Sequence, residues 1–351
     1  MRDRMEQLER IRAYLASYDG PEVKFMEVCG THTASIAKQG IPSILSPKIR
    51  LISGPGCPVC VTVTDYIDRL IALAKEKENV IVSFGDLLRV RGSAESLSEA
   101  KAEGAKVVMV YAPSQTLDLA EKDPQHTYIF AAVGFETTAP VYALMLQEAD
   151  RRGLENVKLL TSLKTMPQVI DWVCADGSVP IDGFLAPGHV CSVTGYACYE
   201  PLAEKYHLPF VVSGFSGEQL LASIYRLTRL RGTDRVENLY RSVVERDGNP
   251  EALSLMERFY EPCDASWRGM GRIAGSGLLL RKEYAKRDAG SAGLDGDHAG
   301  TGCQCASVLT GRISPTGCPL FGGICTPQDP HGACMVSQEG ACYNYFISGR
   351  K

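Results

Sequence analysis

TYIFAAVGF, residues 127–135, decides the fold class of this chain. Nearly all of its residues are apolar or small, as expected for a strand that is buried on both faces of a parallel sheet. Similar runs occupy residues 23–28, 49–54, 79–85, 105–111, 156–162, 181–187 and 208–214. Helix-like segments, among them residues 138–152, 166–174 and 216–230, alternate with these runs. The alternation predicts an α/β protein with parallel sheets.

The runs predict three domains along the chain. Residues 1–140 and 141–232 read as two α/β domains with parallel sheets that face a central cleft. The alternation fades after residue 233, and Gly, Pro and Cys dominate from residue 288. We therefore expect residues 233–351 to form a C-terminal iron–sulfur domain that is organised by a metal centre rather than by a large apolar core.

The composition excludes several classes of protein. The first twenty of the 351 residues mix charges with apolar residues at helical spacing, unlike a signal peptide, and no run of about eighteen apolar residues predicts a membrane span. A net charge of -4 argues against nucleic acid as a partner. We expect a cytoplasmic protein. Thirteen cysteines are many for that compartment, which favours metal or redox roles.

Two cysteine motifs lie in loops that leave predicted strands, where open parallel sheets bind their ligands. Cys57 and Cys60 stand in GPGCPVC, a spacing that suits disulfide exchange or metal binding, although two such thiols can also simply occupy a turn. Cys29 precedes a predicted helix start, which favours a thiolate, and His32 follows it at a distance suited to orientation or ligation. The alternative for this second pair is a buried cysteine beside a structural histidine.

Polar residues in two further loops are candidates for the same cleft. Glu136 and Thr137 lie in GFETT at a strand-to-helix turn, where free amides can hold an anion or where threonine can cap the helix. His189 follows the predicted strand at 181–187 and is either a cleft residue or an ordinary turn histidine.

Six cysteines crowd the last fifty residues among Gly and Pro, without the histidine pairs of a zinc finger. Four of them are separated by 14, 6 and 16 residues, namely Cys303, Cys318, Cys325 and Cys342. Four thiolates on irregular loops favour a [4Fe–4S] cluster over a structural zinc ion. Spacing alone leaves Cys305 and Cys334 as neighbours of the cluster, as redox-active thiols or as alternative ligands.

Together these motifs resemble the HypD family, which takes part in assembling the iron–dicyanide–carbonyl unit of [NiFe] hydrogenases. The resemblance covers nearly the whole chain in one motif order and rests on CGTH (29–32), GPGCPVC (54–60), GFETT (134–138), PGHV (187–190) and the tail CPLFGGICTP…GACMVSQEGAC (318–342).

The resemblance implies an assembly scaffold with redox activity rather than a conventional turnover enzyme. A transferable Fe(CN)2CO iron would be held between Cys29 and a cysteine of a small HypC-type chaperone, and a HypE-type partner would donate cyanide. Cys57 and Cys60 match the family's thiol pair, which would pass electrons between the cluster and the iron. His32, Glu136, Thr137 and His189 match cleft residues of the family.

Two positions depart from the family pattern. Ala34 stands where members often carry a second histidine, and Cys191 stands where serine is common, which would add a thiol near the iron. A stand-alone iron–sulfur thiol–disulfide reductase is the alternative function, because it would need the same cluster and thiol pair.

Overall fold

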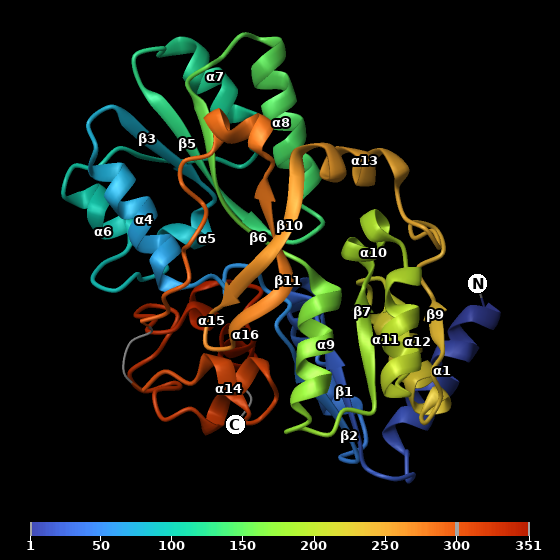
Figure 1. The fold of residues 1–351 in the computed structure, drawn as a ribbon. Helices are drawn as coiled ribbons and strands as arrows, with labels where there is room; N and C mark the ends of the chain where they lie inside the picture. Colours follow the sequence, from blue (N-terminus) through green and yellow to red (C-terminus); the bar gives the residue numbers. More distant parts are fainter. Residues whose placement is uncertain (1, 299–301, 350–351) are drawn as a thin grey trace.

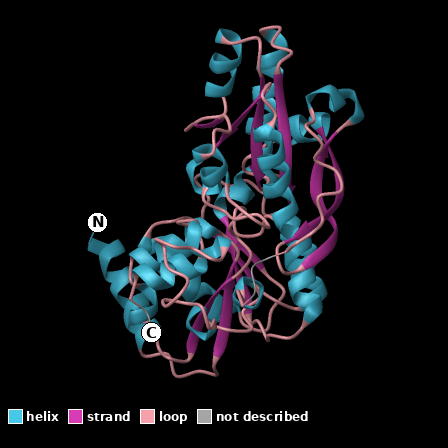
Figure 2. Cartoon of the chain, turned by 90° about the vertical axis from the view of Figure 1, so that its left-hand side faces the viewer, coloured by secondary structure: helices cyan, strands magenta, loops and turns pink. Residues whose placement is uncertain are grey.

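The structure is a computed structural model, which describes residues 2–298 and 302–349. It contains two sheets, one above the other, with helices around them (Figures 1 and 2). The five-stranded sheet is parallel throughout and consists, in spatial order, of β2 (Ile49–Ser53), β1 (Val23–Glu27), β7 (Gly183–Pro187), β8 (Phe210–Ser213) and β9 (Val236–Asn238).

The second sheet has six strands and is only partly parallel. Its spatial order is β10 (Tyr260–Trp267), β11 (Gly271–Leu280), β6 (Val157–Lys164), β5 (Thr127–Gly134), β3 (Asn79–Ser83) and β4 (Val107–Met109). Strands β3 to β6 pair in parallel, whereas β11 runs antiparallel to both β6 and β10. Every strand expected from an apolar run is present, and the short β9 and the long β10–β11 hairpin are additions.

The strands do not follow the predicted order of domains. β1 pairs with β2 on one side and with β7 on the other, so the boundary expected at residue 140 does not separate the two sheets. The predicted C-terminal unit is divided as well, because β9 extends the first sheet and the β10–β11 hairpin extends the second. Apolar runs reveal which segments are strands. When a strand is buried on both faces, however, its sequence does not show which strands it pairs with.

Helices cover both sheets and bury the apolar faces. They are α1 (Arg2–Ala16), α2 (Gly30–Lys38), α3 (Ile41–Ile44), α4 (Thr64–Lys75), α5 (Gly85–Leu88), α6 (Leu97–Ala102), α7 (Gln115–Lys122), α8 (Ala139–Arg151), α9 (Met166–Asp176), α10 (Gly188–Thr194), α11 (Glu200–Tyr206), α12 (Gly217–Leu230), α13 (Pro250–Phe259), α14 (Cys305–Leu309), α15 (Ala333–Val336) and α16 (Ala341–Ile347). In the six-stranded sheet, α4 packs on one face and α8 on the other.

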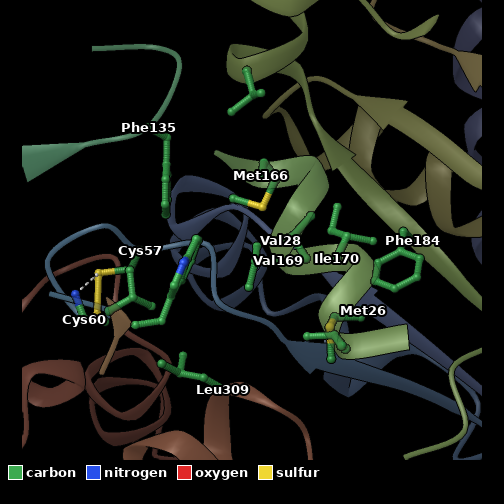
Figure 3. Packing of buried hydrophobic residues seen from close by; sticks show 14 of the residues in the cluster. Met26, Val28, Cys57, Cys60, Phe135, Met166, Val169, Ile170, Phe184 and Leu309 are labelled. Atoms are coloured by element: carbon green, nitrogen blue, oxygen red, sulfur yellow. Dashed lines mark hydrogen bonds between the residues drawn. A yellow bond between two sulfur atoms is a disulfide. The ribbon is translucent and has the colours of Figure 1, made fainter. Parts of the chain in front are cut away.

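The largest apolar cluster joins the two sheets and the C-terminal segment. It includes Met26 of β1, Phe135 after β5 and Leu309 of α14, and it also contains Cys57 and Cys60 (Figure 3). The C-terminal segment, red in Figure 1, packs against both sheets through this cluster. The cysteine motifs of the two ends of the chain therefore share one core.

Candidate functional site

The loops that follow β1 and β2 pack against each other with no room for a side chain. The Gly30 amide donates a hydrogen bond to the Gly56 carbonyl at 2.8 Å. A Cβ atom on Gly56 would lie 2.1 Å from the backbone nitrogen of Cys29, far inside van der Waals contact. Glycine at position 56 is thus what allows Cys29 to lie directly beside the loop that carries Cys57.

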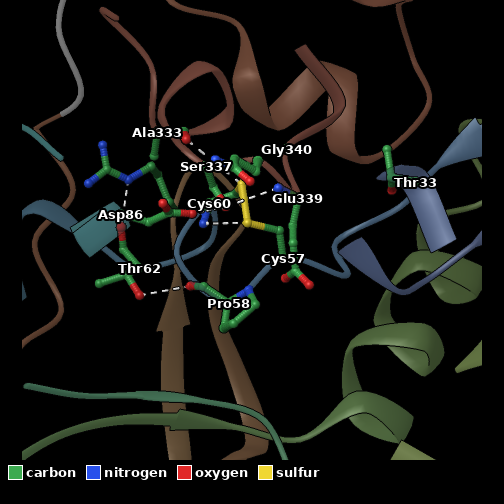
Figure 4. Close-up of a disulfide and its surroundings, with 12 residues drawn as sticks. Thr33, Cys57, Pro58, Cys60, Thr62, Asp86, Ala333, Ser337, Glu339 and Gly340 are labelled. Carbon is green, nitrogen blue, oxygen red and sulfur yellow. Dashed lines mark hydrogen bonds between the residues drawn. A yellow bond between two sulfur atoms is a disulfide. The ribbon is translucent and has the colours of Figure 1, made fainter. Parts of the chain in front are cut away.

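Cys57 and Cys60 form a disulfide, with their Cα atoms 5.3 Å apart. Both residues are buried, with exposed fractions of 2% and 0%. The Cys60 amide donates to the Cys57 sulfur at 3.2 Å, and the Cys60 sulfur lies 3.8 Å from the carbonyl oxygen of Ala333 in α15 (Figure 4). The disulfide therefore lies between the Cys29 loop and the C-terminal cysteine segment.

Cys29 precedes the first residue of α2 and is buried. The amides of Thr31 and His32 favour its thiolate, as the sequence predicts for a helix start. Burial has the larger effect, however, and together with the nearby carboxyl groups of Glu339 and Glu27 it raises the pKa of the Cys29 thiol to about 12. The expected lowering of this pKa is therefore wrong for the protein without a metal, and a cation at the sulfur would be needed to stabilise the thiolate.

His32 is completely buried and neutral. Its Nε2 lies 3.3 Å and 3.2 Å from the carbonyl oxygens of Ser213 and Gly214, which assigns the ring proton to that nitrogen. Burial lowers the pKa of His32 to about 4, and its Nδ1 has no hydrogen-bond partner. The Phe215 ring lies between His32 and the exposed His189, with centroid distances of 4.7 Å and 3.8 Å. The two predicted histidines thus flank one aromatic ring.

Glu136, two residues after the end of β5, is also buried. Its Oε1 accepts a hydrogen bond from the Met166 amide at 2.7 Å, its Oε2 has no partner, and burial raises the pKa of the carboxyl group to about 7. Glu136 and Cys29 both act electrostatically on the buried Cys191 thiol, so the structure brings these three residues together. Thr137 is half-buried, and it is the neighbouring Thr138 whose hydroxyl donates a hydrogen bond, to the Phe135 carbonyl.

Three residues near Cys29 were not predicted from the sequence. The Cys29 amide donates to Glu27 Oε2 at 3.1 Å, and the Thr31 hydroxyl donates to Glu339 Oε1 at 2.7 Å. Burial raises the pKa of Glu27 to about 8 and also raises that of Glu339. Tyr199 is fully buried, has an unpartnered hydroxyl and is influenced by Cys29. Glu27 had a visible signal, because it is a charged residue inside an apolar strand.

The C-terminal cysteines line a small pocket of about 10 Å³. Its cysteines are Cys303, Cys305, Cys318, Cys325 and Cys342. Gly332 closes one side, where a Cβ atom would lie 2.7 Å from the Cys303 sulfur and 2.6 Å from the Cys305 sulfur. Cys334 is fully buried and is not part of the pocket lining.

The donor set of this pocket suits an iron–sulfur cluster. Within the described residues, no group of three or more His, Cys, Asp or Glu side chains is arranged to hold a single metal ion, so the fit rests on the chemistry of the donor atoms. Five thiols face a pocket that is otherwise lined by Leu320, Phe321, Gly332 and Met335, and thiolates in apolar surroundings are the usual ligands of such clusters. Which four of them act as ligands stays a prediction.

The helices of the described residues do not include one that is both long and apolar enough to cross a membrane.

Comparison with known proteins gives consistent matches along the chain. A family model named HypD and described as "Hydrogenase formation hypA family" matches residues 4–349. The hydrogenase maturation factor HypD of Rhodobacter capsulatus is 40% identical, over 98% of this chain and 94% of its own length. The hydrogenase expression/formation protein HupD of Azotobacter chroococcum mcd 1 is 39% identical, over 94% of this chain and 90% of its own length. The hydrogenase maturation factor HypD of Cupriavidus necator is 37% identical, over 98% of this chain and 95% of its own length.

Proposed function

The chain belongs to the HypD family of hydrogenase maturation factors, and from this premise we propose that it holds one iron ion, its substrate, at Cys29 while cyanide and carbon monoxide are attached. The observation that carries this proposal is the contact between the Cys29 loop and the loop of the Cys57–Cys60 disulfide, which Gly56 makes possible. A soft thiolate suits a low-spin iron with strong-field ligands. A HypC-type chaperone would supply a second thiolate, and a HypE-type partner would donate cyanide.

Polar residues around Cys29 would assist the binding of iron to its sulfur. Binding requires the thiol to lose its proton, and the carboxyl groups of Glu27 and Glu339 lie nearby to take part in that transfer. The unpartnered Nδ1 of His32 and Oε2 of Glu136 are buried polar atoms without protein partners. Such atoms cost about 1–3 kcal/mol each when left unsatisfied, so a bound substrate with polar ligands would remove that cost.

The disulfide is proposed as the electron store of the site. Opening the Cys57–Cys60 bond consumes two electrons and two protons and gives two thiols. When bound in the cysteine pocket, a [4Fe–4S] cluster would supply electrons one at a time. Cys60 lies against Ala333, one residue before Cys334, and this contact between the disulfide and the C-terminal cysteine segment supports the proposal.

The test is to purify the chain anaerobically with its HypC-type partner and to record infrared bands of bound cyanide and carbon monoxide. Cys29→Ala should abolish these bands and the iron beyond the cluster content, whereas Cys174→Ala, a matched change at a half-buried thiol outside the site, should keep both. If the Cys29 variant keeps the extra iron with its diatomic ligands, iron is held elsewhere, with Cys57, Cys60 or Cys191 as the next candidates.

A stand-alone thiol–disulfide reductase is disfavoured by burial. Such an enzyme must present a sulfur atom to the disulfide of a partner protein, but neither Cys57 nor Cys60 is more than 2% exposed. Reduction of insulin or thioredoxin disulfides by the isolated chain would reverse this preference.

A further inference from the structure

The tip of the β10–β11 hairpin lies between the disulfide loop and the C-terminal cysteines. The Arg268 amide donates to the carbonyl of Val61, directly after Cys60, at 2.9 Å. The next residue, Gly269, packs so closely on α14 that a Cβ atom there would lie 2.4 Å from the Cβ of Ala306. The hairpin, which the sequence did not predict, therefore contacts both cysteine regions at once.

The Arg268 side chain adds a further contact between the hairpin and the disulfide loop. It is only 6% exposed, and its Nε donates to the carbonyl of Thr62 at 2.6 Å. Its Nη2 is buried and has no hydrogen-bond partner. Among the groups that act on it electrostatically are Cys303 and Cys305, which line the cysteine pocket.

A buried guanidinium with an unused donor needs a physical reason. Arginine stays charged in proteins, and a buried charge without a partner is costly. The carboxylate of Asp297, which accepts a hydrogen bond from the Gly269 amide at 2.6 Å, acts on the guanidinium with opposite charge and compensates in part. Nη2 itself stays without a protein partner, and the thiols of Cys303 and Cys305 are among the groups whose charge acts on the guanidinium.

We propose that Arg268 is a positioning residue that couples the disulfide loop to the metal centre of the cysteine pocket, with Nε holding the Thr62 carbonyl and Nη2 donating to a cysteine sulfur at that centre. The inference rests on the proposed function, because it assumes a cluster in the pocket. Positive charge and hydrogen bonds to sulfur stabilise the more negative, reduced state of an iron–sulfur cluster. Arg268 thereby raises the reduction potential of the cluster and fixes its distance to the disulfide.

The first test measures the cluster potential in the anaerobic full-length protein by dithionite titration followed by electron paramagnetic resonance. Arg268→Gln should retain the cluster but shift its reduction equilibrium at least tenfold toward the oxidised state, about 59 mV for one electron. Arg272→Gln removes an exposed arginine of the same hairpin and should leave the potential unchanged. A cluster with the wild-type potential in Arg268→Gln would overturn the proposal.

The second test remains decisive if the glutamine variant loses its cluster. Arg268→Lys keeps the charge but cannot reach both the Thr62 carbonyl and a sulfur in the same way. With dithionite as the one-electron donor, the Cys57–Cys60 disulfide of the Arg268→Lys variant should be reduced at least tenfold more slowly than that of the wild type. The rate of its direct reduction by a phosphine should be unchanged. Equal rates in both proteins would overturn the inference alone, whereas wild-type protein without any iron–sulfur cluster would overturn the proposed electron store itself.

Discussion

Gly56→Ala is the most direct probe of how the two loops build the site. The added Cβ would lie 2.1 Å from the Cys29 nitrogen and 2.4 Å from the Val28 carbonyl carbon, and both are backbone atoms. Overpacking of this kind costs about 1–3 kcal/mol, and the upper end applies where no flexible side chain can move away. Replacing glycine by alanine also stabilises by about 0.4–1 kcal/mol through the unfolded chain. The free energy of unfolding should therefore fall by about 2 kcal/mol.

The assay combines urea denaturation with iron binding. Because the clash pushes the Cys29 loop away from the disulfide loop, Gly56→Ala should also lose iron at Cys29 while it keeps its cluster. The matched control is Gly323→Ala, since a Cβ at that position meets no atom within 4 Å and its φ is not left-handed. A Gly56→Ala protein that is as stable as the control and still binds iron at Cys29 would refute the argument that the two loops must touch.

Three further predictions follow from the site. Burial raises the pKa of Glu136 from 4.5 to about 7, so its protonated form favours folding: this contribution is complete below about pH 4.5 and is lost as the pH rises through 7. Glu136→Gln should remove up to about 3 kcal/mol of that dependence in urea titrations between pH 4.5 and 7.5, and an unchanged slope would exclude Glu136 as its source. Cys57→Ala should stop attachment of the diatomic ligands, so that their infrared bands are absent. Iron should still bind at Cys29 when the HypC-type partner is present, and loss of this iron would contradict the assigned role. Anaerobically isolated protein should carry about four cluster irons. Absorption and iron analysis should show that alanine at any predicted ligand, Cys303, Cys318, Cys325 or Cys342, removes more of the cluster than Cys305→Ala or Cys334→Ala. The reverse ranking would be evidence against this ligand set.

The sequence predicts the strands of this fold better than their arrangement. Runs such as residues 127–135 are apolar along their whole length, and β5 occupies Thr127–Gly134. The pairing of β1 with β7 could not be predicted, because it depends on which apolar surfaces meet and not on the runs themselves. The β10–β11 hairpin was missed for a different reason. Its second strand, GRIAGSGLLL, interrupts the apolar pattern with glycine and serine.

The candidate site shows a similar division. Motif spacing identified Cys29, Cys57 and Cys60, and the structure places their loops in direct contact. The thiol pKa was misjudged, because a helix start is a local feature whereas burial depends on the whole fold. Glu339 and Arg268 could not be assigned to the site from the sequence, since each reaches it from a distant segment through contacts that no local pattern records.

The pairing of β1 with β7 also has a consequence during protein synthesis. β1 and β2 leave the ribosome early, but β7, the strand that pairs with the other edge of β1, begins only at Gly183. At about 5–20 residues per second, the two strands wait roughly 7 to 26 seconds for this partner. Until then the free edge of β1, with Phe25 and Met26, is open to pairing with other nascent chains. Ribosome stalling between residues 54 and 182 should therefore increase aggregation more than stalling after residue 240, when all strands of this sheet have been made.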